Sequence, residues 1–219
     1  MGLMDDVFGF DLVDGLASGR CPICHALAAD ERRWLDSFRR EGRRDPATRR
    51  RFFAAGGFCS RHAWLLHGLV ADAEGGAAIA DVYGALADRD LAESIMPSAA
   101  RERPRTRGML RRTGECPACL AAADALDRKT HFFRELLGGS AGRERYERSA
   151  ALCLPHLRSA IAAAGREDET STYLLRDWRR RLDAVREQLA DVCRWRDEDG
   201  PCSQVIRLYV GDGSVRGAR

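Results

Sequence analysis

Cysteine and histidine recur in the chain at two spacings that suit the binding of a metal ion. A C-P-x-C sequence at residues 21–24 is followed, after a spacer of 34 residues, by C-x-x-H at residues 59–62. The same two motifs return at residues 116–119 and 153–156, with 33 residues between them. Two close pairs of this kind let four side chains converge on one ion. The eight candidate metal ligands are Cys21, Cys24, Cys59, His62, Cys116, Cys119, Cys153 and His156.

Three thiolates and one imidazole fill the tetrahedral shell of a structural zinc ion and leave no position open for water. We therefore expect two zinc ions per chain, each with a structural role. The expected grouping follows the repeats. Cys21 and Cys24 should share one ion with Cys59 and His62, and the four later ligands should share the other.

Two other interpretations of these motifs remain open. A [4Fe–4S] cluster is the alternative cofactor, because histidine occasionally replaces a cysteine ligand of a cluster. Cluster sites usually draw most of their cysteines from one tight run, whereas this chain offers two equal pairs, and this difference favours zinc. A thioredoxin-like redox dithiol would need a βαβ context that the sequence lacks, and it would leave the C-x-x-H motifs unexplained.

The two pairs of motifs belong to an internal repeat. C-P-x-C recurs at an offset of 95 residues and C-x-x-H at an offset of 94, so that one deletion aligns the two copies. A fixed offset is typical of a duplicated structural unit. Four further positions then coincide: Phe38 with Phe133, Arg39 with Arg134, Phe52 with Tyr146, and Phe58 with Leu152.

Tandem C-P-x-C units, each followed some 35 residues later by G-[F/L]-C-x-x-H, resemble an uncharacterised family of bacterial helical proteins, a domain of unknown function. The resemblance covers approximately residues 20–160 and implies a helical fold without implying an activity. Ala151 stands where the motif has glycine, a departure that concerns the local turn and not the ligands. The matching residues are Cys21, Pro22, Cys24, Gly57, Phe58, Cys59 and His62, and then Cys116, Pro117, Cys119, Leu152, Cys153 and His156.

Local sequence features place each pair of ligands at the start of a helix. The proline of C-P-x-C suits the first turn, where its missing N–H costs no hydrogen bond. Asp45-Pro46 predicts the N-cap and first residue of a second helix, which Gly56-Gly57 ends. Cys59 and His62 then fall at i and i+3 in the first turn of a third helix, on one face.

Apolar residues at helical spacing continue in both copies, and the longest stripe runs from Leu174 to Trp195. We predict an all-α fold of two duplicated helical units, each clamped by a Cys3His metal site. The expected segments are an N-terminal segment at 1–20, the first metal-binding repeat at 21–97, a linker at 98–114, the second repeat at 115–196 and a C-terminal tail at 197–219.

The tail contains an apolar run at residues 205–210 that ends at Gly211-Asp212-Gly213. This pattern predicts a short C-terminal strand. Because no partner strand is evident, we expect an edge, a docking tail or a contact between two copies.

Few other residues are candidates for chemistry. Cys193 and Cys202 have no counterparts in the first copy and could be reactive thiols, although idle thiols are the favoured interpretation. His131 and Glu135 lie at i and i+4 and could act as an acid–base or metal-binding pair, whereas a solvent-facing helix pair is favoured. No phosphate-binding or hydrolase fingerprint occurs in the sequence.

Composition limits the classes of protein. The 219 residues are 45% hydrophobic and 32% charged, an ordinary globular balance, but only 7% aromatic. The net charge is +3, and Lys129 is the only lysine, so that 35 of the 36 basic residues are arginine. Such a bias is typical of GC-rich coding, and the arginine runs therefore argue little for nucleic acid.

No stretch approaches the ~20 apolar residues of a membrane helix, so we expect no membrane partner. The acidic start at Asp5-Asp6 lacks the pattern of a secretory signal, and we expect a cytoplasmic protein.

These observations favour a zinc-binding, non-enzymatic binding or adaptor module that contacts a protein partner or a second copy of itself. The alternative is a metalloenzyme or redox protein that uses an iron–sulfur cluster or the thiols Cys193 and Cys202. A third and weaker hypothesis is nucleic-acid binding through Arg-rich helix faces.

Overall fold

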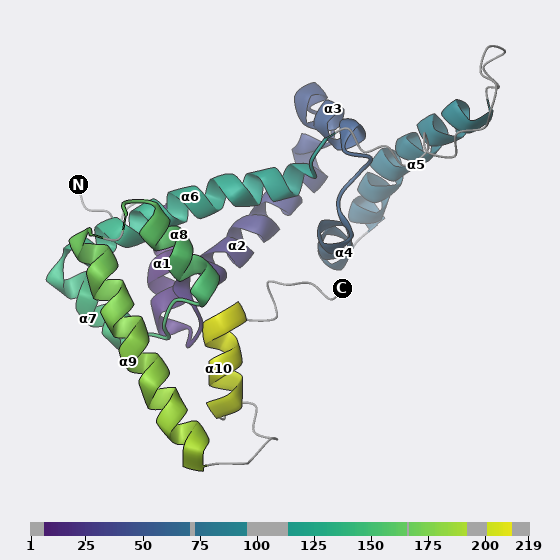
Figure 1. Ribbon diagram of the computed structural model, residues 1–219. Helices are drawn as coiled ribbons and strands as arrows, with labels where there is room; N and C mark the ends of the chain where they lie inside the picture. Colours follow the sequence, from purple (N-terminus) through teal and green to yellow (C-terminus); the bar gives the residue numbers. More distant parts are fainter. Residues whose placement is uncertain (1–6, 71–72, 96–113, 166, 192–200, 212–219) are drawn as a thin grey trace, which may run out of the picture. The chain divides into compact units, whose positions relative to one another are not determined.

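The computed structural model describes residues 7–70, 73–95, 114–165, 167–191 and 201–211, and all regular secondary structure in this part of the chain is helical (Figure 1). It contains ten α-helices and one π-helical turn, η1, and no strand. The elements are α1 (Val7–Ala17), α2 (Pro22–Ser37), η1 (Phe38–Gly42), α3 (Pro46–Ala54), α4 (Ser60–Gly68), α5 (Ala73–Ile95), α6 (Pro117–Gly138), α7 (Ser140–Arg148), α8 (Leu154–Ala162), α9 (Glu169–Asp191) and α10 (Pro201–Val210).

Helix lengths repeat along the chain in the order that the two sequence copies predict. After α2 and after α6 come two helices of 9 residues and one of 23 residues. α1 precedes the first series and α10 follows the second. The predicted helix starts are confirmed, because α2 and α6 begin at the prolines of the C-P-x-C motifs. Asp45 caps α3 as predicted, since its carboxylate accepts a hydrogen bond from the Thr48 N–H at 2.7 Å.

The π-helical turn η1 marks a difference between the two series. The Arg43 N–H donates to the Phe38 carbonyl at 2.9 Å, an i→i+5 bond that encloses one residue more than an α-turn. At the equivalent place α6 is α-helical throughout. The offset between the copies falls from 95 to 94 between Phe38 and Phe52, so this turn accommodates the additional residue.

The described chain forms two compact units. Unit 1 contains residues 7–29 and those from Asp124 to Gly211, and unit 2 contains Asp30–Ala123. Neither unit coincides with a sequence repeat, because α2 and α6 each begin in one unit and end in the other.

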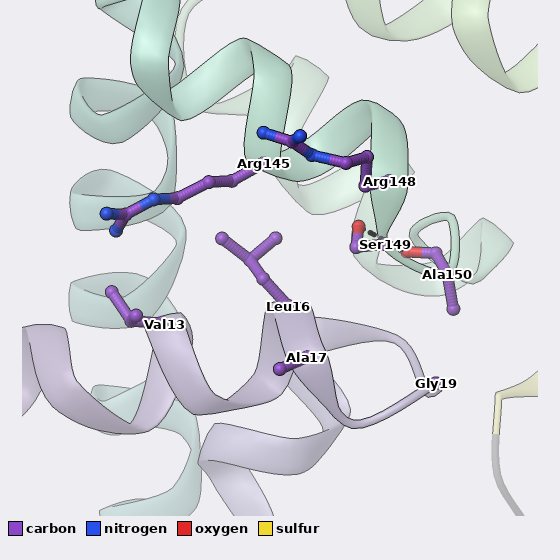
Figure 2. Close-up of a pocket in the computed structure, with 8 residues that line it drawn as sticks. All are labelled: Val13, Leu16, Ala17, Gly19, Arg145, Arg148, Ser149 and Ala150. Carbon is purple, nitrogen blue, oxygen red and sulfur yellow. Dashed lines mark hydrogen bonds between the residues drawn. The ribbon is translucent and has the colours of Figure 1, made fainter.

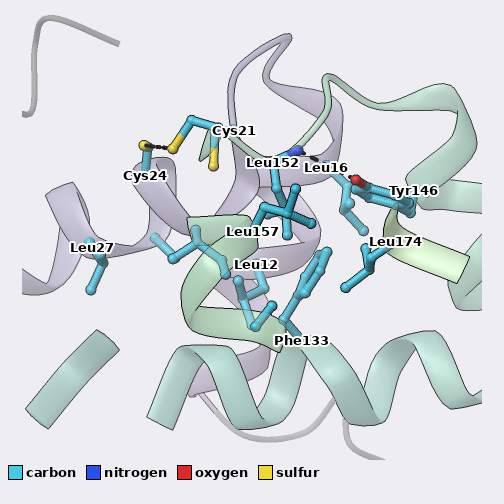
Figure 3. Packing of buried hydrophobic residues seen from close by; sticks show 14 of the residues in the cluster. Leu12, Leu16, Cys21, Cys24, Leu27, Phe133, Tyr146, Leu152, Leu157 and Leu174 are labelled. Atoms are coloured by element: carbon cyan, nitrogen blue, oxygen red, sulfur yellow. Dashed lines mark hydrogen bonds between the residues drawn. The ribbon is translucent and has the colours of Figure 1, made fainter. Parts of the chain in front are cut away.

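The core of unit 1 surrounds the ring of Tyr146, which is fully buried (Figure 3). Its hydroxyl accepts a hydrogen bond from the Leu152 N–H at 3.4 Å, and its ring packs edge-on against Phe133 at 5.5 Å. The Arg181 guanidinium lies 5.3 Å above the same ring. Leucines from five helices belong to the cluster: Leu12, Leu16, Leu27, Leu137, Leu157 and Leu174, with Leu152 from the segment before α8.

The core of unit 2 is built on three phenylalanine rings. Phe58 packs edge-on against Phe38 at 4.8 Å and against Phe52 at 5.1 Å. Val82 and Leu86 of α5 cover this group. The sequence alignment places Phe133, Tyr146 and Leu152 at the corresponding positions of the second copy, and these residues lie in the core of unit 1.

The predicted C-terminal strand is wrong, because residues 201–210 form helix α10. Leu208 and Gly211 are buried and Val205 is half-buried, and this three-residue spacing belongs to a helix. Pro201 at the first position and Gly211, with a φ of +77°, mark the two ends of the helix. Helix α1 was not predicted, although Leu12 and Leu16 have the i, i+4 spacing of a buried helix face.

The predicted linker at 98–114 lies outside the described residues except for Gly114. Across the described part of the chain, none of the helices has both the length and the apolar character needed to span a bilayer.

Candidate metal centres

The ends of four helices carry the eight candidate ligands. Cys21 and Cys116 immediately precede α2 and α6, and Cys24 and Cys119 lie in the first turns of these helices. Cys59 and Cys153 are the N-cap residues of α4 and α8, each with extended backbone. His62 and His156 follow in the first turns, where their side chains lie on the same face as the preceding cysteine.

Site 1 consists of Cys21, Cys24, Cys153 and His156, all of which are buried in unit 1. The four ligand atoms lie within 4.8 Å of one another. The Nδ1 atom of His156 is 3.4 Å from Cys21 Sγ, 3.3 Å from Cys24 Sγ and 3.2 Å from Cys153 Sγ. Cys24 Sγ and Cys153 Sγ are 3.7 Å apart. A ring nitrogen and three sulfurs therefore surround a single point.

Site 2 consists of Cys59, His62, Cys116 and Cys119 in unit 2, again within 4.8 Å of one another. Its distances nearly repeat those of site 1. The Nδ1 atom of His62 lies 3.2 Å from Cys59 Sγ, 3.6 Å from Cys116 Sγ and 3.4 Å from Cys119 Sγ. The Sγ atoms of Cys59 and Cys119 are 3.7 Å apart. Each site can hold one metal ion.

The predicted grouping of ligands within each repeat is wrong. Each C-P-x-C motif meets the C-x-x-H motif of the other repeat, so that Cys24 lies with Cys153 and Cys59 with Cys119. The reason lies in the course of the chain through α2, a helix of 16 residues. This helix begins in unit 1 and ends in unit 2, so the chain has left site 1 before it reaches Cys59.

Polar residues support the histidine of site 2. The Nε2 atom of His62 faces Glu31, with Oε1 3.6 Å away, and the Arg61 guanidinium pairs with the same carboxylate. A carboxylate behind a histidine ligand fixes the orientation of the ring and makes it a better donor to a metal. At the aligned positions of the other copy stand Leu126 and Pro155, which cannot form such an ion pair.

The two sites differ in how well the surrounding protein shields their ligands from solvent. All four ligands of site 1 are buried, and Gly211 at the end of α10 lies against its sulfurs. A Cβ atom at Gly211 would come within 3.0 Å of Cys24 Sγ and 3.3 Å of Cys153 Sγ. In site 2, by contrast, Cys119 is exposed and Cys59 is half-buried. Site 1 is therefore enclosed and site 2 is open to solvent on one side.

Burial and hydrogen bonds give the site 2 residues very different pKa values. Although Cys119 is exposed, partial desolvation of its thiol by neighbouring groups raises its pKa to about 12, and the charge of Cys116 contributes in the same direction. Burial also raises the pKa of Cys116, but hydrogen bonds from His62 and from backbone N–H groups outweigh it and lower the value to about 6. Burial lowers the pKa of His62, whereas its bonds to Cys116 and Glu31 raise it, with a net result of about 10.

Site 1 shows the same division between its thiols. Burial raises the pKa of Cys21 well above its usual range, and hydrogen bonds from Cys21, Cys24 and His156 lower that of Cys153. Three thiols around one point repel one another when all are ionised. A bound divalent cation removes this conflict, because it favours the thiolate form of each ligand.

The remaining candidates do not join either site. His131 and Glu135 form an exposed pair on α6, with His131 Nε2 3.4 Å from Glu135 Oε1 and the His131 side chain 71% exposed. This is the solvent-facing arrangement favoured by the sequence. Cys193 lies outside the described residues, and for Cys202 only the backbone position on α10 is described.

Two cavities of unit 1 lie beside the core. One, of about 430 Å³, lies between α1 and α7, where Val13, Leu16 and Ala17 face Arg145 and Arg148 (Figure 2). The other, of about 380 Å³, lies beneath α10 and is lined on one side by Cys21 of site 1. Among the described residues that line them, neither cavity has a histidine or a carboxylate that could act as an acid or base.

Comparison of the chain with protein-family models, with curated proteins and with solved structures gives no match. The two Cys3His clusters in a helical fold are thus the features that bear on function.

Proposed function

We propose that sites 1 and 2 each bind one structural zinc ion and that the protein is a non-enzymatic helical binding module. The observation that carries this proposal is the convergence of three sulfurs and one ring nitrogen in each site within 4.8 Å. All four tetrahedral positions are then taken by protein ligands, which is the arrangement of a structural zinc site.

The distances between ligand atoms support zinc over a cluster. Zinc bonds of ~2.3 Å to sulfur and ~2.0 Å to nitrogen place tetrahedral sulfurs about 3.8 Å apart, and sulfur about 3.5 Å from nitrogen. The sulfurs of Cys24 and Cys153 and those of Cys59 and Cys119 are each 3.7 Å apart, and sulfur–nitrogen distances run from 3.2 to 3.6 Å. A four-iron cluster places four metal atoms between its ligands and needs a wider cage.

The sites would act as cross-links between distant parts of the chain. Site 1 joins residues separated by up to 135 positions, and site 2 joins residues separated by up to 60. Structural zinc in finger peptides contributes ~10 kcal/mol of folding free energy at neutral pH. We propose that this contribution stabilises a core with few aromatic residues, and that the repeated series of helices reflects a duplicated unit.

Exposed apolar residues support a binding role. Ile206 and Tyr209 on the outer face of α10 are 59% and 45% exposed, and Val210 beside them is also exposed. An apolar group on one helix face is typical of a contact with another protein. We propose a protein partner or a second copy of the chain, in a reducing compartment such as the cytoplasm, where thiol ligands persist.

Metal analysis of the protein as purified tests the proposal. Two zinc ions per chain and a colourless solution are expected, and a brown solution with a band near 400 nm would identify an iron–sulfur cluster instead.

Light scattering then tests whether the chain associates with a second copy of itself, and Ile206→Glu should dissociate that pair. Arg179→Glu, an exposed change on α9, is the control. Steeply salt-dependent binding to DNA or RNA would favour the nucleic-acid hypothesis.

A further inference from the structure

The two sites share their internal distances but differ in access to solvent. In each site a cysteine of the C-P-x-C motif lies 3.7 Å from the N-cap cysteine of the other motif, Cys24 from Cys153 and Cys119 from Cys59. Cys24 and Cys153 are buried, whereas Cys119 is exposed and Cys59 is half-buried. Site 1 is thus a matched internal control for the effect of exposure on site 2.

The end of α10 increases this difference. Gly211 lies so close to the sulfurs of Cys24 and Cys153 that an added Cβ atom would be in tight contact with both. A small oxidant that approaches site 1 from this side meets backbone. The Cys119 sulfur, which a bound divalent cation would hold in the thiolate form, is exposed and has no backbone against it of this kind. Thiolate character together with exposure is the condition under which cysteines are oxidised selectively.

We propose that site 2 is an oxidation-sensitive site, where a hydroperoxide joins Cys59 to Cys119 in a disulfide and releases the metal ion. The inference rests on the proposed binding of metal at this site. The two sulfurs, 3.7 Å apart, come from the starts of α4 and α6. They need to approach by about 1.7 Å to reach the ~2.0 Å length of a disulfide.

The reaction balances with one hydroperoxide. The Cys119 thiolate attacks the peroxide oxygen, whose O–O bond breaks, and forms a sulfenic acid. The Cys59 thiolate then attacks the sulfenic sulfur and displaces hydroxide. With hydrogen peroxide, two thiolates lose one electron each, the peroxide gains two electrons, and two protons from solvent complete two water molecules. Cys116 and His62 remain as two ligands, too few to retain the ion.

The experiment uses the full chain loaded with two zinc ions. Hydrogen peroxide is added with a chromophoric zinc chelator, and mass spectrometry of the digested protein locates the disulfide. One zinc equivalent should be released at least tenfold faster than the second, together with a Cys59–Cys119 disulfide. Reduction and added zinc should restore two ions per chain.

Several outcomes would overturn the inference. These are release of both ions at one rate, a first disulfide between Cys24 and Cys153, a disulfide between Cys116 and Cys119, or zinc release without a disulfide. The metal content before oxidation separates this inference from the proposed function. A chain that never holds two ions contradicts the zinc proposal, whereas two ions with equal release contradict only the sensitivity of site 2.

Discussion

The Sγ atoms of Cys24 and Cys153 lie 3.7 Å apart although 129 residues separate the two cysteines in the sequence. A metal ion at this place would connect the start of α2 to the start of α8 and so hold together parts of unit 1 that the chain supplies at its two ends. Removal of either ion should therefore loosen contacts between distant parts of the sequence.

Pairs of cysteine substitutions test which ligands share an ion. The double variant Cys24→Ala/Cys153→Ala removes two ligands of site 1 and should retain one zinc equivalent at site 2. The double variant Cys24→Ala/Cys59→Ala removes one ligand from each site and should retain none, because a closed site has no spare ligand. Metal analysis of the two proteins gives opposite results if each repeat binds its own ion.

Much of the local structure around the ligands could be predicted from the sequence. Prolines after Cys21 and Cys116 and the N-cap at Asp45 depend on residues that are close in the sequence, and the structure confirms the helix starts that they predict. The pairing of the motifs between repeats depends on where α2 and α6 carry the chain, and no local pattern records this.

Helices α10 and α1, near the two ends of the described chain, were also not predicted from the local sequence pattern. At residues 205–210 the short apolar run, taken by its periodicity alone, fits a strand or a helix, and the structure shows a helix buried against the core. The features that could have identified it are Pro201 before the run and Gly211 after it, at the spacing of a helix. Helix α1 could have been found from Leu12 and Leu16.

Glu31 should strengthen metal binding at site 2 through His62. The substitution Glu31→Gln removes the charge behind the His62 ring and should weaken zinc binding at site 2 by about 10- to 100-fold, with site 1 unchanged. Competition with a chelator of known affinity measures both sites. Glu135→Gln is the matched control, because its histidine neighbour, His131, lies in neither site. Equal effects of the two substitutions would refute the supporting role of Glu31.

Gly211 should be required for the enclosure of site 1. Gly211→Ala introduces a Cβ atom at a φ of +77° and within 3.0 Å of Cys24 Sγ. Gly165→Ala is the matched control, with a φ of +87° and nothing within 4 Å of the added atom. Backbone strain of ~1 kcal/mol should lower the melting temperature by about 2–4 °C in either variant.

The close contact adds a second effect in Gly211→Ala alone. This variant should melt lower than Gly165→Ala and should release the site 1 ion faster, because α10 must shift away from the sulfurs. Thermal melts and the rate of zinc transfer to a chelator measure the two effects. The enclosure of site 1 by α10 is wrong if both variants melt and release zinc alike.

The π-helical turn predicts an asymmetric response to single-residue deletions. Deletion of exposed Arg40 should convert η1 into the α-helical form found at the same place in α6, at the cost of only a surface ion pair with Asp36. Both ions should then be retained and the melting temperature should fall by a few degrees at most. Deletion of the aligned Glu135 removes a residue from a continuous α-helix and rotates the following residues by about 100°.

That rotation would turn Leu137, now fully buried, away from the core of unit 1. The Glu135 deletion should therefore lower the melting temperature by more than 10 °C or leave the protein aggregated, since loss of a buried leucine alone costs ~2–5 kcal/mol. Melting curves and metal analysis of the two deletion variants measure this difference. Equal damage from both deletions would show that the additional residue in η1 is required by the fold of unit 2 rather than accommodated by it.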